Sequence, residues 1–237
     1  MNLKRCFFYY CLLQVSISFG QTSTVKDVAM DIIAKDGTKL KATYYSPGKP
    51  GPGMLLFHQC NMDRKCWSSF ANALAENGVH VLTFDFRGYG ETPSAGGMWP
   101  NLEGDMDSAF SKLIKLPGVN GKLAAGGASC GVGVAVDLAR RTGKIKALVL
   151  MTGPVSDDGL KYLRENKQLA IFSAASDKDQ PAITYLKPLV DNSTNPLSRM
   201  IILKNGPTGD AGHGVPLFKA DPSLMQSAVK WVTEVLK

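Results

Sequence analysis

The chain has 237 residues, of which 44% are hydrophobic and 20% are charged, and its formal net charge is +7. This length supports one domain with a sizeable core and is short for two. The basic residues are scattered, with neither a basic tract nor interleaved aromatic residues. The composition therefore argues against nucleic acid as a partner.

The first 20 residues differ from the rest of the chain. Two basic residues, Lys4 and Arg5, precede about a dozen mostly apolar residues, and small residues follow. This pattern predicts a secretory signal peptide over 1–20 and a mature single domain over 21–237, exported to the periplasm or secreted. An uncleaved N-terminal anchor is the alternative, although the apolar run is too short and too interrupted to be a good membrane span. Cleavage would lower the net charge to +5, because the segment holds Lys4 and Arg5 and no acidic residue.

Three cysteines, Cys60, Cys66 and Cys130, follow this segment. They form no CxxC pair and no Cys/His cluster, so the sequence predicts no metal site. Cys60 and Cys66 lie in one predicted loop and are candidates for a disulfide in an oxidising compartment. Two free, partly buried thiols are the alternative, since spacing cannot supply the bond geometry.

Short apolar runs and helical patterns alternate along the mature chain. Residues 25–34 and 38–46 predict an opening hairpin with Asp36-Gly37 at its turn. Further strands are predicted at 54–58, 79–85, 122–128, 146–152, 168–175 and 199–205. Helices are predicted at 67–77, 102–115, 131–142, 180–191 and from 221 onward.

This alternation is typical of βαβ units and of a mostly parallel sheet covered by helices on both faces. Continuous apolar strands, such as residues 147–151, fit burial on both faces better than alternating ones would. The expected fold is a three-layer α/β sandwich of about eight strands, of which the first pair is antiparallel.

The stretch GGASCGVG (126–133) lies between a predicted strand and a predicted helix. It contains Gly127-x-Ser129-x-Gly131, the G-x-S-x-G pattern of a sharp strand-to-helix turn that exposes a nucleophilic serine. Centring the pattern on Cys130 would put Val132 in a glycine position, so the register favours Ser129. The backbone N–H of Cys130 is then expected in an oxyanion hole, with its thiol in the core. A glycine-rich turn or an anion cradle is the alternative.

A serine nucleophile needs a base and a group that orients the base. His213 is the only histidine after Ser129, and it lies in a glycine-rich loop between the last predicted strand and helix. The acid is expected between them in chain order. Asp177 and Asp179 follow a predicted strand, and the residue types alone do not show which of them is the acid. Asp157 and Asp158 are the second choice.

Four segments together resemble the α/β-hydrolase superfamily, in particular its small, cap-free members related to dienelactone hydrolases and carboxylesterases. The segments are LLFHQCNMDRKCW (55–67), LTFDFRGYGET (82–92), GASCG (127–131) and AGHGVPLF (211–218). They occur in the family's order, and the resemblance runs over nearly the whole mature chain.

The resemblance implies roles for single residues. Ser129 would be the nucleophile, His213 the general base and Asp179 the acid, with Asp177 second. The other oxyanion donor would be the backbone N–H of Cys60, with that of Gln59 as the fallback.

Other residues of these segments are expected to be structural. Gln59 stands where the family usually has glycine, so its backbone is stiffer. His58, Asp85 and Arg87 are expected to shape their turns, the last two as a pair. Catalysis would need no metal and no cofactor.

Between the strands predicted at 146–152 and 168–175 there is room for a short helix only, where lidded members of the family carry their lid. The site is therefore expected to be open and to suit small or surface-presented esters, with Trp67, Met98 and Trp99 as candidate lining residues. The predicted function is hydrolysis of a small carboxylic ester, lactone or thioester. Dienelactone hydrolase-type activity, peptidase activity on the same triad, and a non-catalytic exported binding protein are the alternatives.

Overall fold

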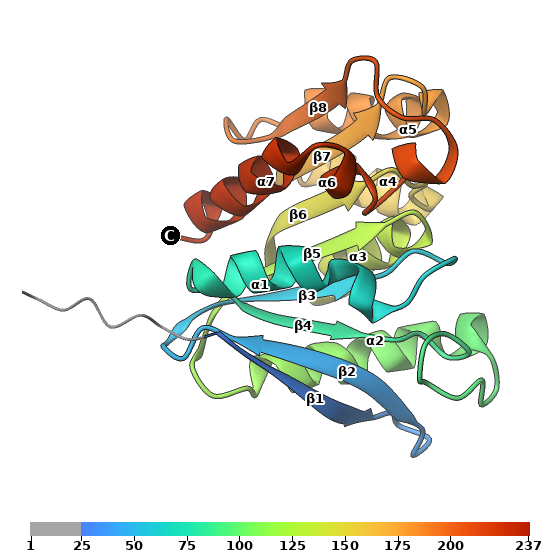
Figure 1. Cartoon of the computed structure of the whole chain (residues 1–237), viewed down its shortest axis with the longest axis vertical. Helices are drawn as coiled ribbons and strands as arrows, with labels where there is room; N and C mark the ends of the chain where they lie inside the picture. The colour runs from blue at the N-terminus through green and yellow to red at the C-terminus, as the bar shows by residue number, and fades with distance from the viewer. Residues whose placement is uncertain (1–24) are drawn as a thin grey trace, which may run out of the picture.

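The computed structural model describes residues 25–237, so the predicted signal peptide at 1–20 lies outside the described residues. Eight strands form one sheet in the order β1-β2-β4-β3-β5-β6-β7-β8. The pairs β1–β2 and β2–β4 are antiparallel, and all the other pairs are parallel. The predicted fold class is confirmed: a mostly parallel eight-stranded sheet between two layers of helices (Figure 1).

The elements follow the predicted alternation. The strands are β1 (Lys26–Ile33), β2 (Lys39–Ser46), β3 (Gly51–Phe57), β4 (His80–Phe84), β5 (Val119–Ala128), β6 (Ile145–Met151), β7 (Ala170–Ser176) and β8 (Arg199–Leu203). The α-helices are α1 (Ser68–Glu76), α2 (Met98–Ile114), α3 (Cys130–Thr142), α4 (Asp157–Glu165), α5 (Gln180–Asp191), α6 (Leu217–Ala220) and α7 (Pro222–Val235). Two short 3₁₀ helices, Arg64–Trp67 and Gly209–Gly212, lie in loops.

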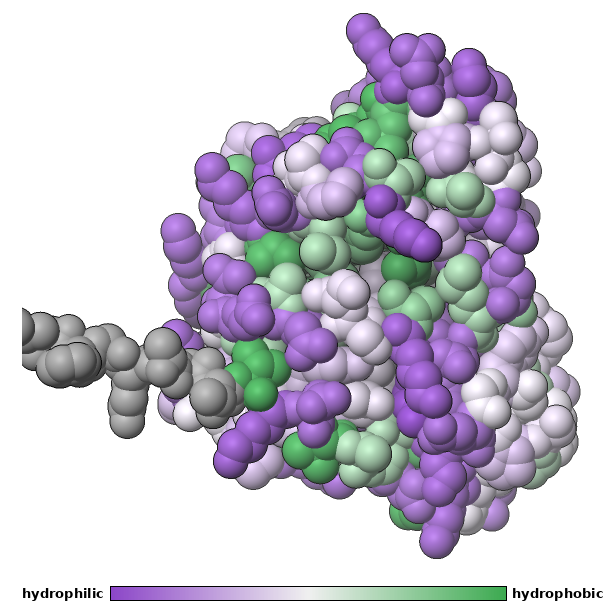
Figure 2. Space-filling view, in the orientation of Figure 1, coloured by the Kyte–Doolittle hydropathy of each residue, from purple (hydrophilic) through white to green (hydrophobic). Residues whose placement is uncertain are grey.

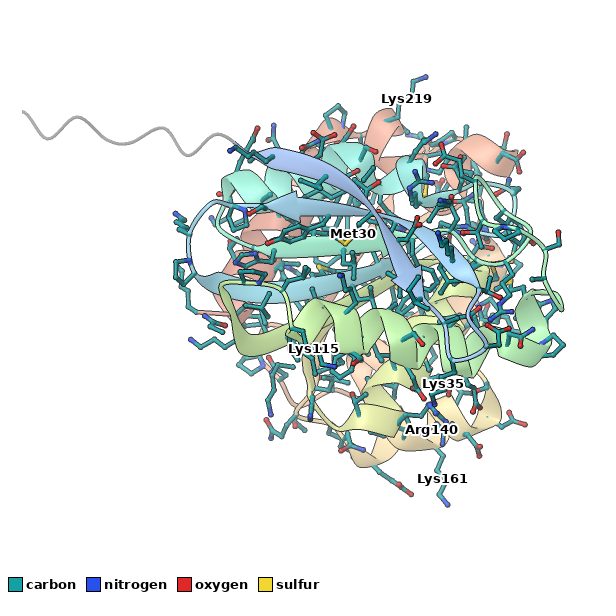
Figure 3. All side chains as sticks on the ribbon, turned by 90° about the horizontal axis from the view of Figure 1, so that it is seen from below. Met30, Lys35, Lys115, Arg140, Lys161 and Lys219 are labelled. Atoms are coloured by element: carbon teal, nitrogen blue, oxygen red, sulfur yellow. A yellow bond between two sulfur atoms is a disulfide. The ribbon has the colours of Figure 1, made fainter. Side chains whose placement is uncertain are left out.

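The two faces of the sheet carry separate hydrophobic cores. One core packs side chains of α1, α6 and α7, including Phe70 and Trp231, against Met54 and Leu56 of β3. The other packs α2, α3, α4 and α5 against the opposite face, with Leu55 and Phe57 as the alternate residues of β3. Strand β3 is thus apolar at every one of these successive positions because both of its faces are covered. Figure 3 shows the two helical layers from below, with Lys219 of α6 and Lys161 of α4 at opposite outer sides.

Local chemistry accounts for the turns that the sequence predicted. In the opening hairpin, Asp36 Oδ1 accepts the Thr38 N–H at 3.0 Å. Gly37 has a φ of 86°, a backbone angle that favours glycine. Helix α5 begins after Asp179, whose side chain caps it, and helix α7 begins after Asp221, which does the same.

Several boundaries differ from the predictions. The helix expected at 67–77 divides into a 3₁₀ turn that ends at Trp67 and helix α1, and α2 begins four residues before the expected 102. The short helix expected between β6 and β7 is α4, and no larger insertion separates the two strands. No helix within residues 25–237 is both long enough and apolar enough to cross a membrane.

Candidate active site

The candidate residues lie in loops at one edge of the sheet. Because β3, β5, β6, β7 and β8 are successive parallel neighbours, their carboxyl ends meet at this edge, where ligands of open α/β sheets bind. The residues that follow these strands are Gln59 and Cys60 after β3, Ser129 after β5, Thr152 after β6, Asp179 after β7 and His213 after β8.

Ser129 occupies the turn between β5 and α3 with φ 50° and ψ −121°. A non-glycine residue in this region is a strained feature that the surrounding structure must hold in place. The flanking glycines are needed for close approach: a Cβ on Gly127 would lie 1.9 Å from the Gly131 carbonyl oxygen, and one on Gly131 would lie 2.4 Å from the Phe57 carbonyl oxygen. The register that selected Ser129 over Cys130 therefore has a steric basis. Its side chain stands half-buried at the start of α3.

His213 meets one of the two predicted acids. Its Nδ1 lies 2.7 Å from Asp179 Oδ2. Since a carboxylate only accepts hydrogen bonds, this contact assigns the proton to Nδ1 and leaves Nε2 as the basic nitrogen. The other oxygen of Asp179 accepts the Ala182 N–H at 3.3 Å as the cap of α5. The carboxylate is thus held from two sides.

Asp177 has a different role. Its two oxygens accept the backbone N–H groups of Asn205 at 2.9 Å and Gly206 at 3.1 Å. The hydrogen bond from Asn205 is the main cause that lowers the pKa of this carboxyl. Asp177 therefore fixes the loop after β8, and the structure brings His213 to Asp179 instead.

The end of β6 contacts both the serine turn and the histidine loop. The Met151 carbonyl accepts the Ser129 N–H at 3.0 Å, and a Cβ on Gly153 would lie 2.1 Å from the Ser129 carbonyl oxygen. Between them, Thr152 Oγ1 accepts the N–H of Gly214, the residue after His213. The Ser129 turn and the loop that carries His213 are therefore both held by the segment 151–153, although no hydrogen bond joins the side chains of Ser129 and His213 within the described part of the chain.

Thr152 is a site residue that the sequence analysis missed. Its side chain is fully buried, and its φ is 50°, an outlier for a β-branched residue. No motif marks it in the sequence, because its role depends on a loop that lies 62 residues further along the chain.

The turn after β3 has a fixed peptide plane. The Gln59 carbonyl accepts hydrogen bonds from His58 Nδ1 at 2.9 Å and from the Met62 N–H at 3.0 Å. In a trans peptide the N–H points away from the carbonyl of the same plane, so the Cys60 N–H is directed to the opposite side. Among the described residues, this N–H donates to no backbone or side-chain acceptor. It is free to bind an oxygen of a substrate.

The disulfide predicted between Cys60 and Cys66 is wrong. Cys60 is bonded to Cys130, with the Cα atoms 5.9 Å apart and a sequence separation of 70. Cys130 is therefore not a thiol in the core. Cys66 is a free thiol in the 3₁₀ turn, and burial raises its pKa to about 12. The pairing follows from topology: β3 and β5 are neighbours, so the residues just beyond their ends meet.

His58 is buried and structural, as predicted. Its Nε2 accepts the Phe86 N–H at 3.0 Å, so its Nδ1 is the donor to the Gln59 carbonyl. Burial lowers the pKa of this imidazole, which favours the neutral form that can make both bonds. The ring thereby joins the turn after β3 to the turn after β4.

Asp85 and Arg87 are structural but do not form a pair with each other, which corrects the prediction. Asp85 accepts the Arg64 N–H at 2.8 Å and also contacts the Arg64 guanidinium. Arg87 binds Asp105 through two nitrogens, at 2.8 and 2.7 Å, and reaches Asp36 in the opening hairpin. Both side chains are buried.

A small polar pocket of about 290 Å³ is lined by Asp179 and His213. A separate apolar groove of about 890 Å³ shares the histidine loop with it. Ala211 and Val215, two residues to either side of His213, contribute to its wall, and Met62 of the turn after β3 faces them. Its far side is formed by residues of α1 and α6, including Phe70 and Phe218. Figure 2 shows hydrophobic groups on this face, between α1 and α6.

The three residues expected to line the site, Trp67, Met98 and Trp99, do not line the groove. Trp67 and Met98 are buried in the two cores, whereas Trp99 is 65% exposed on α2. The groove is formed by other residues, which carry no recognisable sequence pattern. No group of three or more His, Cys, Asp or Glu side chains within residues 25–237 is arranged to hold a metal ion.

Residues 48–191, more than half of the chain, match the sequence family described as serine aminopeptidase, S33. The chain belongs to this family. It is an α/β-hydrolase, and family membership supports hydrolase activity. The matched segment contains the Ser129 turn and Asp179 and ends before His213. None of the curated protein sequences compared with this hydrolase matches it.

Solved structures share the fold of this hydrolase. The esterase Pf2001 of Pyrococcus furiosus superposes with a TM-score of 0.69 at 16% identity, covering 90% of this chain and 94% of the other. A predicted CIB-like hydrolase of Thermoplasma acidophilum gives 0.70 at 17% identity, covering 89% and 99%. The dienelactone hydrolase of Anabaena variabilis gives 0.67 at 18% identity, covering 90% and 99%. The likeness therefore extends over nearly the full length of each of these proteins.

Proposed function

We propose that this protein is an exported serine hydrolase that cleaves small carboxylic esters through Ser129, His213 and Asp179. One observation carries the proposal: His213 Nδ1 is bonded to Asp179, while Ser129 stands on a strained turn at the same sheet edge. A base held in one tautomer by a carboxylate, at the same sheet edge as a partly exposed serine, supports activation of the hydroxyl for acyl transfer.

The reaction proceeds in two steps. His213 Nε2 accepts the Ser129 proton as Oγ attacks the ester carbonyl carbon, and the alcohol leaves after His213 returns the proton to it. Water, deprotonated by the same imidazole, then attacks the acyl-enzyme and releases the acid. Asp179 stabilises the imidazolium that forms in each step.

Two backbone N–H groups are suited to the oxyanion. The Cys130 N–H lies in the first turn of α3, where N–H groups lack partners inside the helix. The Cys60 N–H is directed away from the doubly bonded Gln59 carbonyl. The Gln59 N–H is the alternative to that of Cys60 as the second donor. Preorganised donors of this kind stabilise the negative charge that develops in the transition state.

The groove favours esters with an apolar group. It is lined mainly by apolar side chains, begins at Met62, Ala211 and Val215, and has a volume in the range of small-ligand sites. With only α4 between β6 and β7, no lid covers it in the described part of the chain. An ester with a short or medium apolar chain therefore suits the site better than a small polar one.

Export is part of the proposal. The pattern of residues 1–20 supports it, and so does the Cys60–Cys130 disulfide, since disulfides persist in oxidising compartments such as the periplasm or the extracellular space.

Hydrolysis of p-nitrophenyl esters of increasing acyl length tests the proposal. We expect turnover by the wild type, with kcat/KM rising from acetate to the medium chains. Ser129→Ala and His213→Ala should each lower kcat by at least about 10³-fold while the protein stays folded. Ester hydrolysis that is unchanged in Ser129→Ala would overturn the proposal.

The description of the family favours one further candidate, an aminopeptidase that uses the same three residues. An aminoacyl p-nitroanilide in the same assay separates the two: cleavage of the anilide in preference to the esters would support the peptidase. A lactone in the panel covers the dienelactone hydrolase-type alternative. Absence of turnover on every substrate, with no covalent labelling of Ser129, would favour a non-catalytic binding protein.

A further inference from the structure

We propose that the Cys60–Cys130 disulfide clamps the oxyanion hole, so that catalysis depends on the oxidation state of this bond. The inference rests on the proposed function. The bond joins the two residues whose backbone N–H groups were assigned as oxyanion donors, one in the loop after β3 and the other at the first position of α3.

The two ends of the bond are held very differently. Cys130 begins a helix of 13 residues that packs against β5, so regular helical hydrogen bonds hold its backbone. Cys60 lies in an irregular turn, and its N–H is directed only by the two hydrogen bonds to the preceding carbonyl of Gln59. The disulfide is therefore a covalent connection from the donor in the irregular turn to the donor at the start of the helix.

Oxyanion stabilisation depends steeply on donor position. A donor must lie within about 2.7 to 3.1 Å of the oxyanion, and removal of one donor typically lowers kcat by about 10²–10³-fold. A shift of the Cys60 turn by a fraction of an ångström is enough to weaken the hydrogen bond from the Cys60 N–H to the oxyanion without moving Ser129, His213 or Asp179. The disulfide residues are thus positioning residues, which act through their backbone.

The bond is open to a reductant. Both cysteines are partly exposed. A small dithiol donates two electrons and two protons: the Sγ–Sγ bond breaks, Cys60 and Cys130 become thiols, and the dithiol closes to its own disulfide. Reoxidation by a disulfide of the same class reverses each step.

Cys66 does not disturb this exchange. It lies six residues from Cys60, but burial raises its pKa to about 12, so at neutral pH it stays protonated and a poor nucleophile. Substitution of Cys66 supplies a matched control, because it removes a thiol of the same region without touching the bond.

The test compares the full chain in its oxidised and dithiothreitol-reduced forms, with Cys66→Ser and the double variant Cys60→Ser/Cys130→Ser. We measure kcat and KM for a p-nitrophenyl ester, the inhibition constant of an alkyl boronic acid, and far-UV circular dichroism. The boronic acid forms a tetrahedral adduct on the serine and reports on the oxyanion hole, whereas KM does so only weakly.

Reduction should lower kcat by about 10-fold or more and raise the inhibition constant of the boronic acid by a similar factor. It should leave KM within about twofold of the oxidised value. Reoxidation should restore activity, Cys66→Ser should show the same fold-loss of kcat on reduction as the wild type, and the double variant should be slow and insensitive to dithiothreitol. Should the double variant not fold, reduced wild type at a temperature where its dichroism is native supplies the same comparison.

Three outcomes overturn the inference and are distinct. If the oxidised protein hydrolyses esters through Ser129 and the reduced, folded protein has the same kcat and boronic acid affinity, the clamp is wrong and the proposed function stands. If the oxidised protein hydrolyses no ester, the proposed function fails, and the clamp fails with it. A loss of activity that coincides only with unfolding assigns the bond to stability and also overturns the clamp.

Discussion

Gln59 Oε1 accepts the backbone N–H of Val215 at 3.0 Å, and so joins the turn after β3 to the loop that carries His213. Gln59 is buried, and its Nε2 donates to Asn61 within its own turn. The side chain that replaces the glycine expected at this position therefore connects two parts of the site that lie 156 residues apart in sequence.

We predict that Gln59→Gly lowers both stability and kcat. The substitution leaves the buried N–H of Val215 without an acceptor, which costs about 1–3 kcal/mol, and frees the histidine loop. Chemical denaturation and ester hydrolysis measure the two effects. Asn61→Ala removes only the other hydrogen bond of Gln59 and is the control, so an equal loss of kcat in both variants would contradict the role of the bond to Val215.

Asp179 and Asp177 offer a matched pair of isosteric changes. Asp179→Asn should lower kcat on the order of 10⁴-fold, because an amide cannot enforce the His213 tautomer or stabilise the imidazolium. Asparagine still caps α5, so stability should change little. Asp177→Asn should keep kcat and lower the melting temperature, since it weakens the bonds to Asn205 and Gly206. The reverse pattern would exchange the roles of the two acids.

Thr152 is predicted to position the histidine loop through its hydroxyl. Thr152→Val leaves the buried Gly214 N–H unpaired, which should cost about 1–3 kcal/mol and lower kcat. Thr152→Ser keeps the acceptor and removes the β-branch from a residue with positive φ, so stability should equal or exceed that of the wild type. Thermal unfolding and steady-state kinetics of the pair check this, and equal kcat in both variants would rule out the role.

His58 should make stability dependent on acid. Its pKa in the folded protein is lowered by burial, which outweighs the opposing charge of Asp85, so on acidification the unfolded chain takes up this proton first. The free energy of unfolding should therefore fall as pH drops below about 6.5, by at most about 1.4 kcal/mol per pH unit from this group.

The variant His58→Asn isolates this contribution. Its amide can still donate to the Gln59 carbonyl but does not titrate, so its unfolding free energy should decline less steeply between about pH 7 and 5. His80, whose pKa burial also lowers, is unchanged and supplies the remaining slope. Identical slopes in the wild type and the variant would show that His58 does not titrate in this range.

The elements and the order of the site residues could be predicted from local patterns. Alternating apolar runs and helical periods reflect burial on both faces of each central strand, and the glycine register at Ser129 reflects contacts of 1.9 and 2.4 Å that no side chain permits. The position of His213 after the last strand followed from chain order alone.

The features of the site that local patterns did not predict depend on contacts between segments that are distant in sequence. The pairing of Cys60 with Cys130 arises because β3 and β5 are neighbours, and sequence spacing pointed to the nearer Cys66 instead. The expectation that Cys60 and Cys130 both face one oxyanion already placed these residues side by side, and this was the signal for the correct pairing. Residue types alone did not separate Asp179 from Asp177, because both follow β7. The family resemblance favoured Asp179, and in the structure its side chain is the one that reaches His213.

The most direct test of the account is the site of covalent labelling by a fluorophosphonate, which reacts with activated serines. Peptide mass spectrometry of the oxidised, folded protein should find one label per chain on Ser129, and no label in the His213→Ala variant under the same conditions. A label on another residue, or none on the folded wild type at high probe concentration, would contradict the claim that Ser129 is an activated nucleophile.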